Sequence, residues 1–151
     1  MSPLRTIAGE KMKCKFCEWE KHYKKIYEND HVVAVWGSPY VLAHVKVILK
    51  RHAENLTELS PEEAAALMDA WIRVGKAIEE VVHPDIINWQ INCNWTRHVH
   101  GHIYPRRQSD PDWGEPIHLP TREQDHNKEY FPRELSPEDK KRIEDLIFHK
   151  N

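Results

Sequence analysis

Three features are scarce in this chain of 151 residues, and each scarcity excludes a class of protein. The sequence has 3 cysteines, an odd number that fits reduced thiols better than a disulfide framework. Its longest apolar runs, such as Val32–Trp36, cover only about five residues, which is far short of a membrane span. Its 22 Lys and Arg nearly balance 24 Asp and Glu, and a net charge of −2 argues against non-specific binding to nucleic acid or to an anionic membrane.

The length and composition describe an ordinary globular chain. A chain near 150 residues predicts one domain, which buries roughly two thirds of the unfolded surface, so neither a disulfide nor a metal is needed merely to fold. Hydrophobic residues at 40% and charged residues at 30% indicate neither disorder nor a fibre. Charges are scattered through Met1–Lys15 without the apolar stretch of a signal peptide, so we expect a cytoplasmic protein.

Hydrophobic patterns predict strands and helices in alternation. Runs rich in β-branched residues predict strands over His31–Trp36 and Val45–Leu49, and two further strands are expected over Ile86–Asn92 and His98–Tyr104. The spacing of Trp19, Tyr23 and Ile26 predicts a short helix after a tight turn at residues 14–17.

The clearest helix begins at Ser60, which can cap it, with Pro61 in the first turn and Glu63 completing a capping box. One apolar stripe then runs along it: Ala64, Leu67, Trp71, Val74, Ile78 and Val81. A proline-rich stretch over 105–135 predicts a long loop or arm, and Ser136 begins a last helix. We therefore expect a single α+β domain over 1–151 with a mostly antiparallel sheet and one long helix packed on it. Its core spans 14–107, and a C-terminal arm and helix span 108–151.

The most informative segment is a strand with three alternating histidines. His98, His100 and His102 share one face of an extended strand, roughly 7 Å apart, with Val99 and Ile103 on the other face. Three aligned imidazoles can bind a metal, or act as nucleophile and acid/base toward an anionic centre. They can also be polar residues on a solvated face. The pattern alone does not choose between metal and nucleophile.

Polar side chains flank this strand. Asn92, Asn94 and Thr96 precede it, and Arg106 and Arg107 follow it. Such neutral donors and cations would suit phosphate oxygens. The alternative for the two arginines is a solvated surface pair.

The sequence His98-Val-His-Gly-His-Ile-Tyr, followed by Pro105-Arg106, resembles the signature of the histidine triad (HIT) superfamily of nucleotide hydrolases and transferases. The resemblance covers Cys14 to Arg107. Asn94, four residues before the first histidine, is similar to a bacterial branch described as diadenosine polyphosphate hydrolase-like. Members of this kind form α+β domains that commonly pair into homodimers.

The resemblance implies an activity and roles for the triad. The implied activity is hydrolysis at a nucleoside α-phosphate, of the dinucleoside polyphosphate or nucleoside phosphoramidate type, through a covalent nucleotidyl-histidine. His100 matches the nucleophile, His102 would contact the bridging oxygen or protonate the leaving group, and Asn94 would hold a non-bridging oxygen. The alternatives are a nucleotidyl transferase or phosphorylase, a nucleotide-binding protein without turnover, and a metalloenzyme that uses all three histidines.

The resemblance also implies a structural zinc and a nucleotide-binding surface. Cys14-x-x-Cys17, His52 and His98 match the zinc ligands of some members, against the alternatives of a redox pair or two small buried residues.

Asn92, Thr96 and Arg106 are the candidate substrate contacts beside the triad. Trp36 stands where many members have an acidic residue for the ribose, and it would stack on a base or fill the core. Gly101 replaces an apolar residue of the signature, which predicts a local kink.

Overall fold

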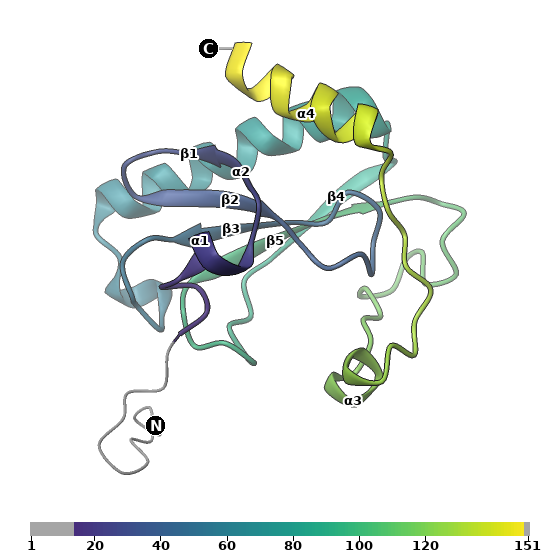
Figure 1. The fold of residues 1–151 in the computed structure, drawn as a ribbon, viewed down its shortest axis with the longest axis horizontal. Coiled ribbons are helices and arrows are strands. Elements are labelled where there is room, and N and C mark those ends of the chain that lie inside the picture. The colour runs from purple at the N-terminus through teal and green to yellow at the C-terminus, as the bar shows by residue number, and fades with distance from the viewer. Residues whose placement is uncertain (1–13, 150–151) are drawn as a thin grey trace.

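The structure is a computed structural model that describes residues 14–149 (Figure 1). Most of the segment Met1–Lys15, where no signal peptide was expected, lies outside this part. The elements, in chain order, are α1 (Trp19–His22), β1 (Lys25–Glu28), β2 (Val32–Trp36), β3 (Val45–Leu49), a 3₁₀ turn (Leu56–Glu58), α2 (Pro61–Val82), β4 (Ile86–Gln90), β5 (His100–Arg106), α3 (Arg122–His126) and α4 (Pro137–His149).

The strands form one five-stranded antiparallel sheet in the order β1-β2-β3-β5-β4, which confirms the α+β prediction. The histidine strand β5 lies between β3 and β4, so its backbone is hydrogen-bonded on both sides. Its register places His100 opposite Ile48 and His102 opposite Lys46. A strand held on both edges keeps its side chains in a fixed row.

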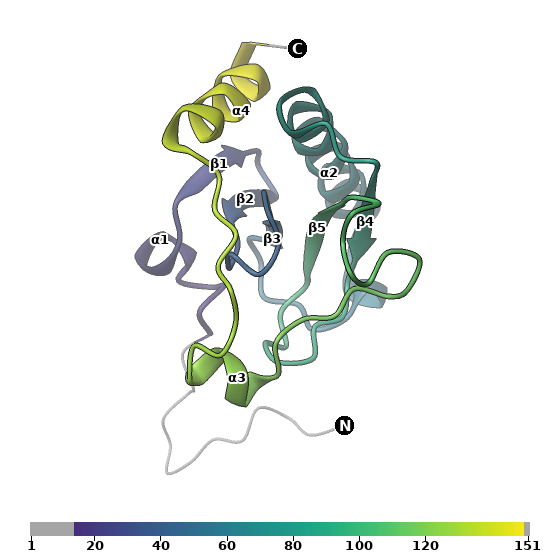
Figure 2. The ribbon, with the colours of Figure 1, turned by 90° about the vertical axis from the view of Figure 1, so that its right-hand side faces the viewer.

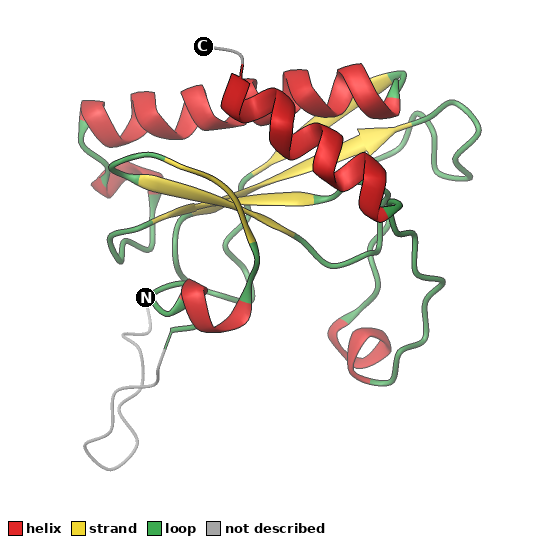
Figure 3. Ribbon diagram, turned by 45° about the horizontal axis from the view of Figure 1, so that its top comes forward, coloured by secondary structure: helices red, strands yellow, loops and turns green. Residues whose placement is uncertain are grey.

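The two faces of the sheet carry different layers. Helices α2 and α4 cover one face, whereas α1 and α3 lie on the other side (Figures 1 and 2). Figure 3 shows the two long helices on one side of the strands. The main core includes Val45, Val47 and Ile103 from the sheet, together with side chains of α2 and α4. A smaller cluster of Phe16, Val33, Val35 and Ile48 lies on the opposite face. His100 lies on this second face because its cross-strand partner Ile48 does, and His102, two residues further along the strand, lies on the same face.

Helix α2 begins as its sequence predicts. Ser60 Oγ accepts a hydrogen bond from Glu63 N at 3.1 Å, and Glu63 Oε1 accepts one from Ser60 N at 2.9 Å. Glu63 also pairs with Arg51 at 3.0 Å, and this hydrogen bond, together with the Ser60 amide, lowers the pKa of Glu63 to about 2. The helix ends at His83 in the left-handed region (φ 52°), directly before Pro84.

Gly101 is required by close packing. A Cβ at this position would lie 2.0 Å from Cζ2 of Trp71 on α2, so only glycine lets the helix sit this close to β5. The expected kink is not the reason for the glycine, since the residues on both sides of it keep their pairing with β3.

Two local expectations were wrong. The first helix ends at His22, and Ile26 lies in β1, where it is 1% exposed and packs in the main core. Tertiary burial of Ile26 therefore overrides the helical spacing. The arm is not wholly irregular, because Thr121 caps the short helix α3 through the amide of Gln124 at 3.1 Å. Within 14–149, no helix combines the length and apolar character needed to cross a membrane.

Candidate functional site

His100 occupies the centre of the site and has a fixed tautomer. Its side chain is 6% exposed, and its Nδ1–H donates to the carbonyl of His98 at 2.6 Å. The lone pair of the neutral ring therefore lies on Nε2. Burial, opposed by this hydrogen bond and reinforced by the charge of Lys46, lowers the pKa of His100 to about 4. At neutral pH the ring is an uncharged nitrogen base with one fixed free nitrogen.

A fourth histidine orients His102. The Nδ1–H of His44 donates to the carbonyl of Ser38 at 2.8 Å, which leaves Nε2 of His44 as an acceptor. That nitrogen lies 2.9 Å from Nδ1 of His102, so His102 donates to it and keeps its own Nε2 unprotonated. Tyr104 stacks against both rings, with ring centroids 5.2 Å from His102 and 4.8 Å from His44.

Burial also keeps this pair neutral. It lowers the pKa of His44 to about 4 and, with the neighbouring His44 and His100, that of His102 to about 2. Sequence analysis assigned no role to His44, which is a single histidine directly before the mostly apolar strand β3. The one sequence feature that could have indicated a role for His44 is its position as a polar residue next to the largely buried strand β3.

Phe16 closes one side of the site. Its ring lies 4.5 Å from that of His100 and 5.8 Å from that of His98, measured between centroids. Phe16 is 2% exposed and comes from the turn between the two cysteines. The N-terminal turn therefore covers the start of the histidine row.

The four predicted metal ligands come together. The ligand atoms of Cys14, Cys17, His52 and His98 all lie within 4.8 Å of one another. His98 Nδ1 is 3.2 Å from His52 Nδ1, 3.4 Å from Cys14 Sγ and 3.6 Å from Cys17 Sγ, and His52 Nδ1 is 3.3 Å from Cys17 Sγ. The other ring nitrogen of His98 donates to the carbonyl of Leu49 at 2.5 Å.

These separations fit a tetrahedral ion. Zinc bonds of about 2.05 Å to nitrogen and 2.3 Å to sulfur place ligand atoms about 3.3 Å apart for two nitrogens and about 3.6 Å apart for nitrogen and sulfur. The hydrogen bond from His98 to Leu49 fixes the tautomer that leaves Nδ1 free for a metal. Because His98 faces this cluster, the three triad histidines do not converge on one ion.

The loop before β5 lies at the edge of the site. Asn92 and Asn94 are exposed, and Thr96 is half-buried. Asn92 donates to the side chain of Gln90 at 3.2 Å, and the Thr96 carbonyl accepts from the amide of His98 at 2.9 Å. The ring of Trp95 in this loop lies 5.8 Å from the guanidinium of Arg122, so α3 of the arm lies beside this loop.

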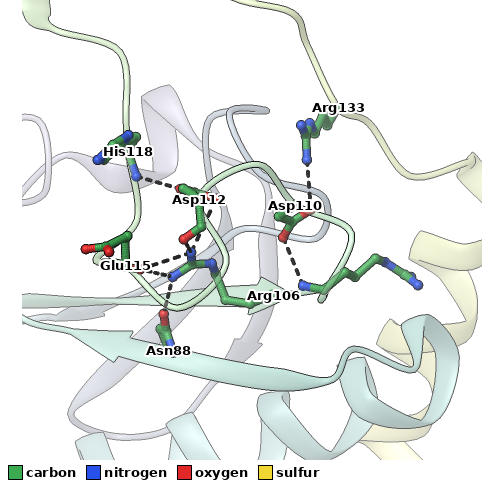
Figure 4. Close-up of polar contacts among 8 residues, drawn as sticks. Asn88, Arg106, Asp110, Asp112, Glu115, His118 and Arg133 are labelled. Carbon is green, nitrogen blue, oxygen red and sulfur yellow. Dashed lines mark hydrogen bonds and ion pairs between the residues drawn. The ribbon is translucent and has the colours of Figure 1, made fainter.

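Arg106 does not have the role that its position after the triad suggested. It is 3% exposed, and its guanidinium donates to Asn88 Oδ1 at 2.5 Å and to the carbonyls of Asp112 and Glu115 at 2.8 and 3.2 Å (Figure 4). It also pairs with the Asp112 carboxylate at 3.3 Å. These contacts fix the arm against the end of β5 and leave no terminal nitrogen for a phosphate.

Trp36 also lies away from the histidines. It packs against the main core on the helix face, and its Nε1 donates to Glu144 of α4 at 3.2 Å. The ammonium of Lys140 lies 5.5 Å from its ring centroid. Of the two roles considered for Trp36, the structure supports packing under α4 rather than base stacking.

The sheet, the row of neutral imidazoles and the adjacent Cys₂His₂ cluster together define a histidine triad type of protein. Residues 18–109 match the HIT domain, and the chain belongs to this family.

Several relatives agree with this assignment. The chain is 29% identical over 124 residues to an uncharacterized HIT-like protein of Saccharolobus solfataricus. The matched region covers 78% of this chain and 87% of that one. It is 27% identical to the adenylylsulfatase HINT3 of Arabidopsis thaliana, over 72% of this chain and 58% of that one. A zinc-bound histidine triad protein of Mycobacterium smegmatis has a similar structure, with a TM-score of 0.65 and 25% identity, over 89% of this chain and 93% of that chain.

Proposed function

We propose that this protein is a nucleotide hydrolase that cleaves at a nucleoside α-phosphate through a covalent nucleotidyl-His100. The observation that carries this proposal is the hydrogen bond from His100 Nδ1 to the His98 carbonyl, because it aims an unprotonated Nε2 away from the backbone. The two carboxylates or metal-bound water of other hydrolytic sites are not needed when an imidazole itself attacks.

The proposed reaction has two steps. Nε2 of His100 forms a bond to the α-phosphorus as the bond to the leaving group breaks and the leaving group departs with the electron pair. Water then attacks the same phosphorus, breaks the N–P bond and releases a nucleoside monophosphate. His102 Nε2, unprotonated because Nδ1 of the same ring donates to His44, would take the proton from that water.

Three further side chains complete the proposed site. Asn94, exposed in the loop before β5, would donate to a non-bridging oxygen whose charge grows during attack. Asn92 and Thr96 of the same loop would contact the rest of the substrate. The relative named as an adenylylsulfatase supports a substrate in which an anionic group leaves from a nucleotide.

Replacement of the nucleophile tests the proposal. A panel of dinucleoside polyphosphates, adenosine phosphosulfate and nucleoside phosphoramidates would be assayed with the wild type, His100→Ala and the control His83→Asn, which changes the C-cap of α2. We expect His100→Ala to lose at least about 10³-fold in kcat on every accepted substrate. Hydrolysis by His100→Ala at the wild-type rate would refute it.

We also propose that the Cys₂His₂ cluster holds a structural zinc ion. Two thiolates and two imidazoles form a closed set with no position for substrate, so the ion would fix the first turn and the start of β5 rather than react. Partial burial and the neighbouring Cys14 raise the pKa of Cys17 to about 11, so the Cys17 thiol ionises readily only when a cation binds it.

Metal analysis and heat denaturation test this zinc site. We expect one zinc per chain, and a strong chelator should lower Tm by roughly 10 °C, since saturation at a thousandfold excess over Kd contributes about 4 kcal/mol. Cys17→Ser should abolish zinc binding, whereas Cys93→Ser, outside the cluster, should not. Full zinc occupancy in Cys17→Ser would exclude the site.

Finally, we propose that two copies pair along the free edge of β4. Met68 and Ile72 are 52% and 46% exposed on α2, and Trp89 of β4 is 42% exposed. The Trp89 ring packs on Gly75, where a Cβ would lie 2.5 Å from it, so these apolar side chains form one patch beside the edge strand.

A further inference from the structure

Lys46 is a cation on the histidine face of the sheet. It is the second residue of β3 and lies directly opposite His102 on β5 and Val35 on β2. Its neighbours in sequence, Val45 and Val47, face the main core, so the Lys46 side chain lies on the other face. Most other positions around it on that face are apolar or aromatic.

The ammonium of Lys46 has aromatic neighbours and no carboxylate partner. Its Nζ lies 5.6 Å from the ring centroid of Phe16 and 5.2 Å from that of Tyr23. Within residues 14–149 no carboxylate forms an ion pair with it. The charge of Asp125 on α3 acts on Lys46 electrostatically, but this carboxylate already accepts a hydrogen bond from the Tyr40 hydroxyl at 2.5 Å.

In the protein without ligand, the surroundings of Lys46 disfavour its positive charge. Burial lowers the pKa of Lys46, and the positive charge of Lys15 lowers it further. The charge of Lys46 in turn helps to lower the pKa values of His44, His100 and His102. By contrast, the next lysine along the chain, Lys50, pairs with Glu28 at 2.8 Å. A half-buried cation that forms no ion pair, and whose attracting carboxylate is bound to another side chain, favours an anion from outside the chain.

Resting on the function proposed above, we propose that Lys46 binds the anionic leaving group of the substrate. The site then prefers nucleotides whose α-phosphate carries a further phosphate or sulfate over those that carry a neutral amine. Phe16 contacts both the His100 ring and the Lys46 ammonium, so the charge lies one ring away from the attacking imidazole. His102, expected beside the departing atom, is the cross-strand partner of Lys46.

Binding to a protein without its nucleophile tests the proposal apart from turnover. In the His100→Ala protein, dissociation constants would be measured calorimetrically for adenosine, AMP and ADP. Adding Lys46→Met should weaken ADP binding about tenfold, weaken AMP binding less, and leave adenosine within about twofold. Lys46→Arg should restore ADP binding, and Lys50→Met, which removes a paired lysine, should leave all three constants unchanged.

Thermal stability separates a binding role from a structural one. Because the ammonium of Lys46 is partly buried and forms no ion pair among the described residues, the ligand-free Lys46→Met protein should have a Tm equal to or above that of its parent. Inorganic phosphate should raise the Tm of the parent more than that of Lys46→Met.

Equal losses for all three ligands, or unchanged ADP affinity, would overturn the assignment of Lys46. If no nucleotide binds to either protein, the proposed function itself fails.

Discussion

His44 extends the histidine row from the site into the protein interior. It is 3% exposed and links Ser38 to His102, so it determines which nitrogen of His102 faces the substrate. Nothing in its sequence context marks this role, because a lone histidine carries no periodic signal. The triad, with three histidines at period two, could be predicted. The hydrogen-bond partners that fix each tautomer could not, because they are backbone carbonyls and a residue 58 positions away.

The buried imidazole of His44 makes stability depend on pH. Burial lowers its pKa in the folded protein to about 4, below the usual 6.5, so between these values the unfolded chain binds a proton that the folded protein does not. The contribution of neutral His44 to stability is therefore complete above pH 6.5 and decreases toward pH 4.

We expect His44→Asn to reduce the difference in unfolding free energy between pH 7 and pH 5 by about 2 kcal/mol, measured by denaturant titration. His31→Asn should leave the difference intact. An unchanged difference in His44→Asn would show that His44 already binds a proton in the folded protein near pH 6.5.

At the scale of elements, β2, β3 and the two long helices were predicted well because their patterns are local, whereas the expected strand over His98–Tyr104 is β5 over His100–Arg106. β3 spans Val45–Leu49 as expected, and α2 has the capping box that Ser60 and Glu63 indicate. The short elements β1 and α3 were not predicted, because packing decides them. Ile26 joins β1 by burial, and α3 is held by contacts such as that of Arg122 with Trp95.

Arg106 was expected to bind substrate because it follows the histidine triad, but its guanidinium is bound to the arm instead. The guanidinium anchors the turn at residues 112–115, so Arg106→Met should leave Asp112 without its partner. We expect a loss of about 3 kcal/mol in stability and faster trypsin cleavage within the arm. Arg73→Met, which breaks an exposed pair with Asp69, serves as control. Weaker phosphate binding with an unchanged arm would instead restore Arg106 as a substrate contact.

At the scale of the whole molecule, the two faces of the sheet divide structure from chemistry. The helix face buries the main core, and the histidine face carries the small cluster around Phe16, the metal-ligand set and the neutral imidazoles. Trp36 packs on the helix face, which supports the core role and not base stacking, and sequence order alone could not choose because it does not say which side of β2 the helices cover.

The proposed dimer depends on the apolar patch of Met68, Ile72 and Trp89 beside the edge strand β4. Ile72→Glu places a charge in the apolar patch beside β4 and should convert a dimer into a monomer, as measured by light scattering after size exclusion. Phe148→Glu introduces the same charge at a position on α4 that is 63% exposed and should leave the mass unchanged. A wild-type protein that is monomeric at all concentrations would contradict the pairing.

The central claim, a covalent nucleotide on His100, is tested most directly by trapping. The wild-type protein would be mixed with a cleavable nucleotide, quenched within milliseconds under conditions that preserve N–P bonds, and analysed by intact mass and peptide mapping. The account predicts a mass increase of one nucleoside monophosphate, located on His100 and absent from His100→Ala. Rapid hydrolysis without any adduct, or an adduct on another residue, would contradict it.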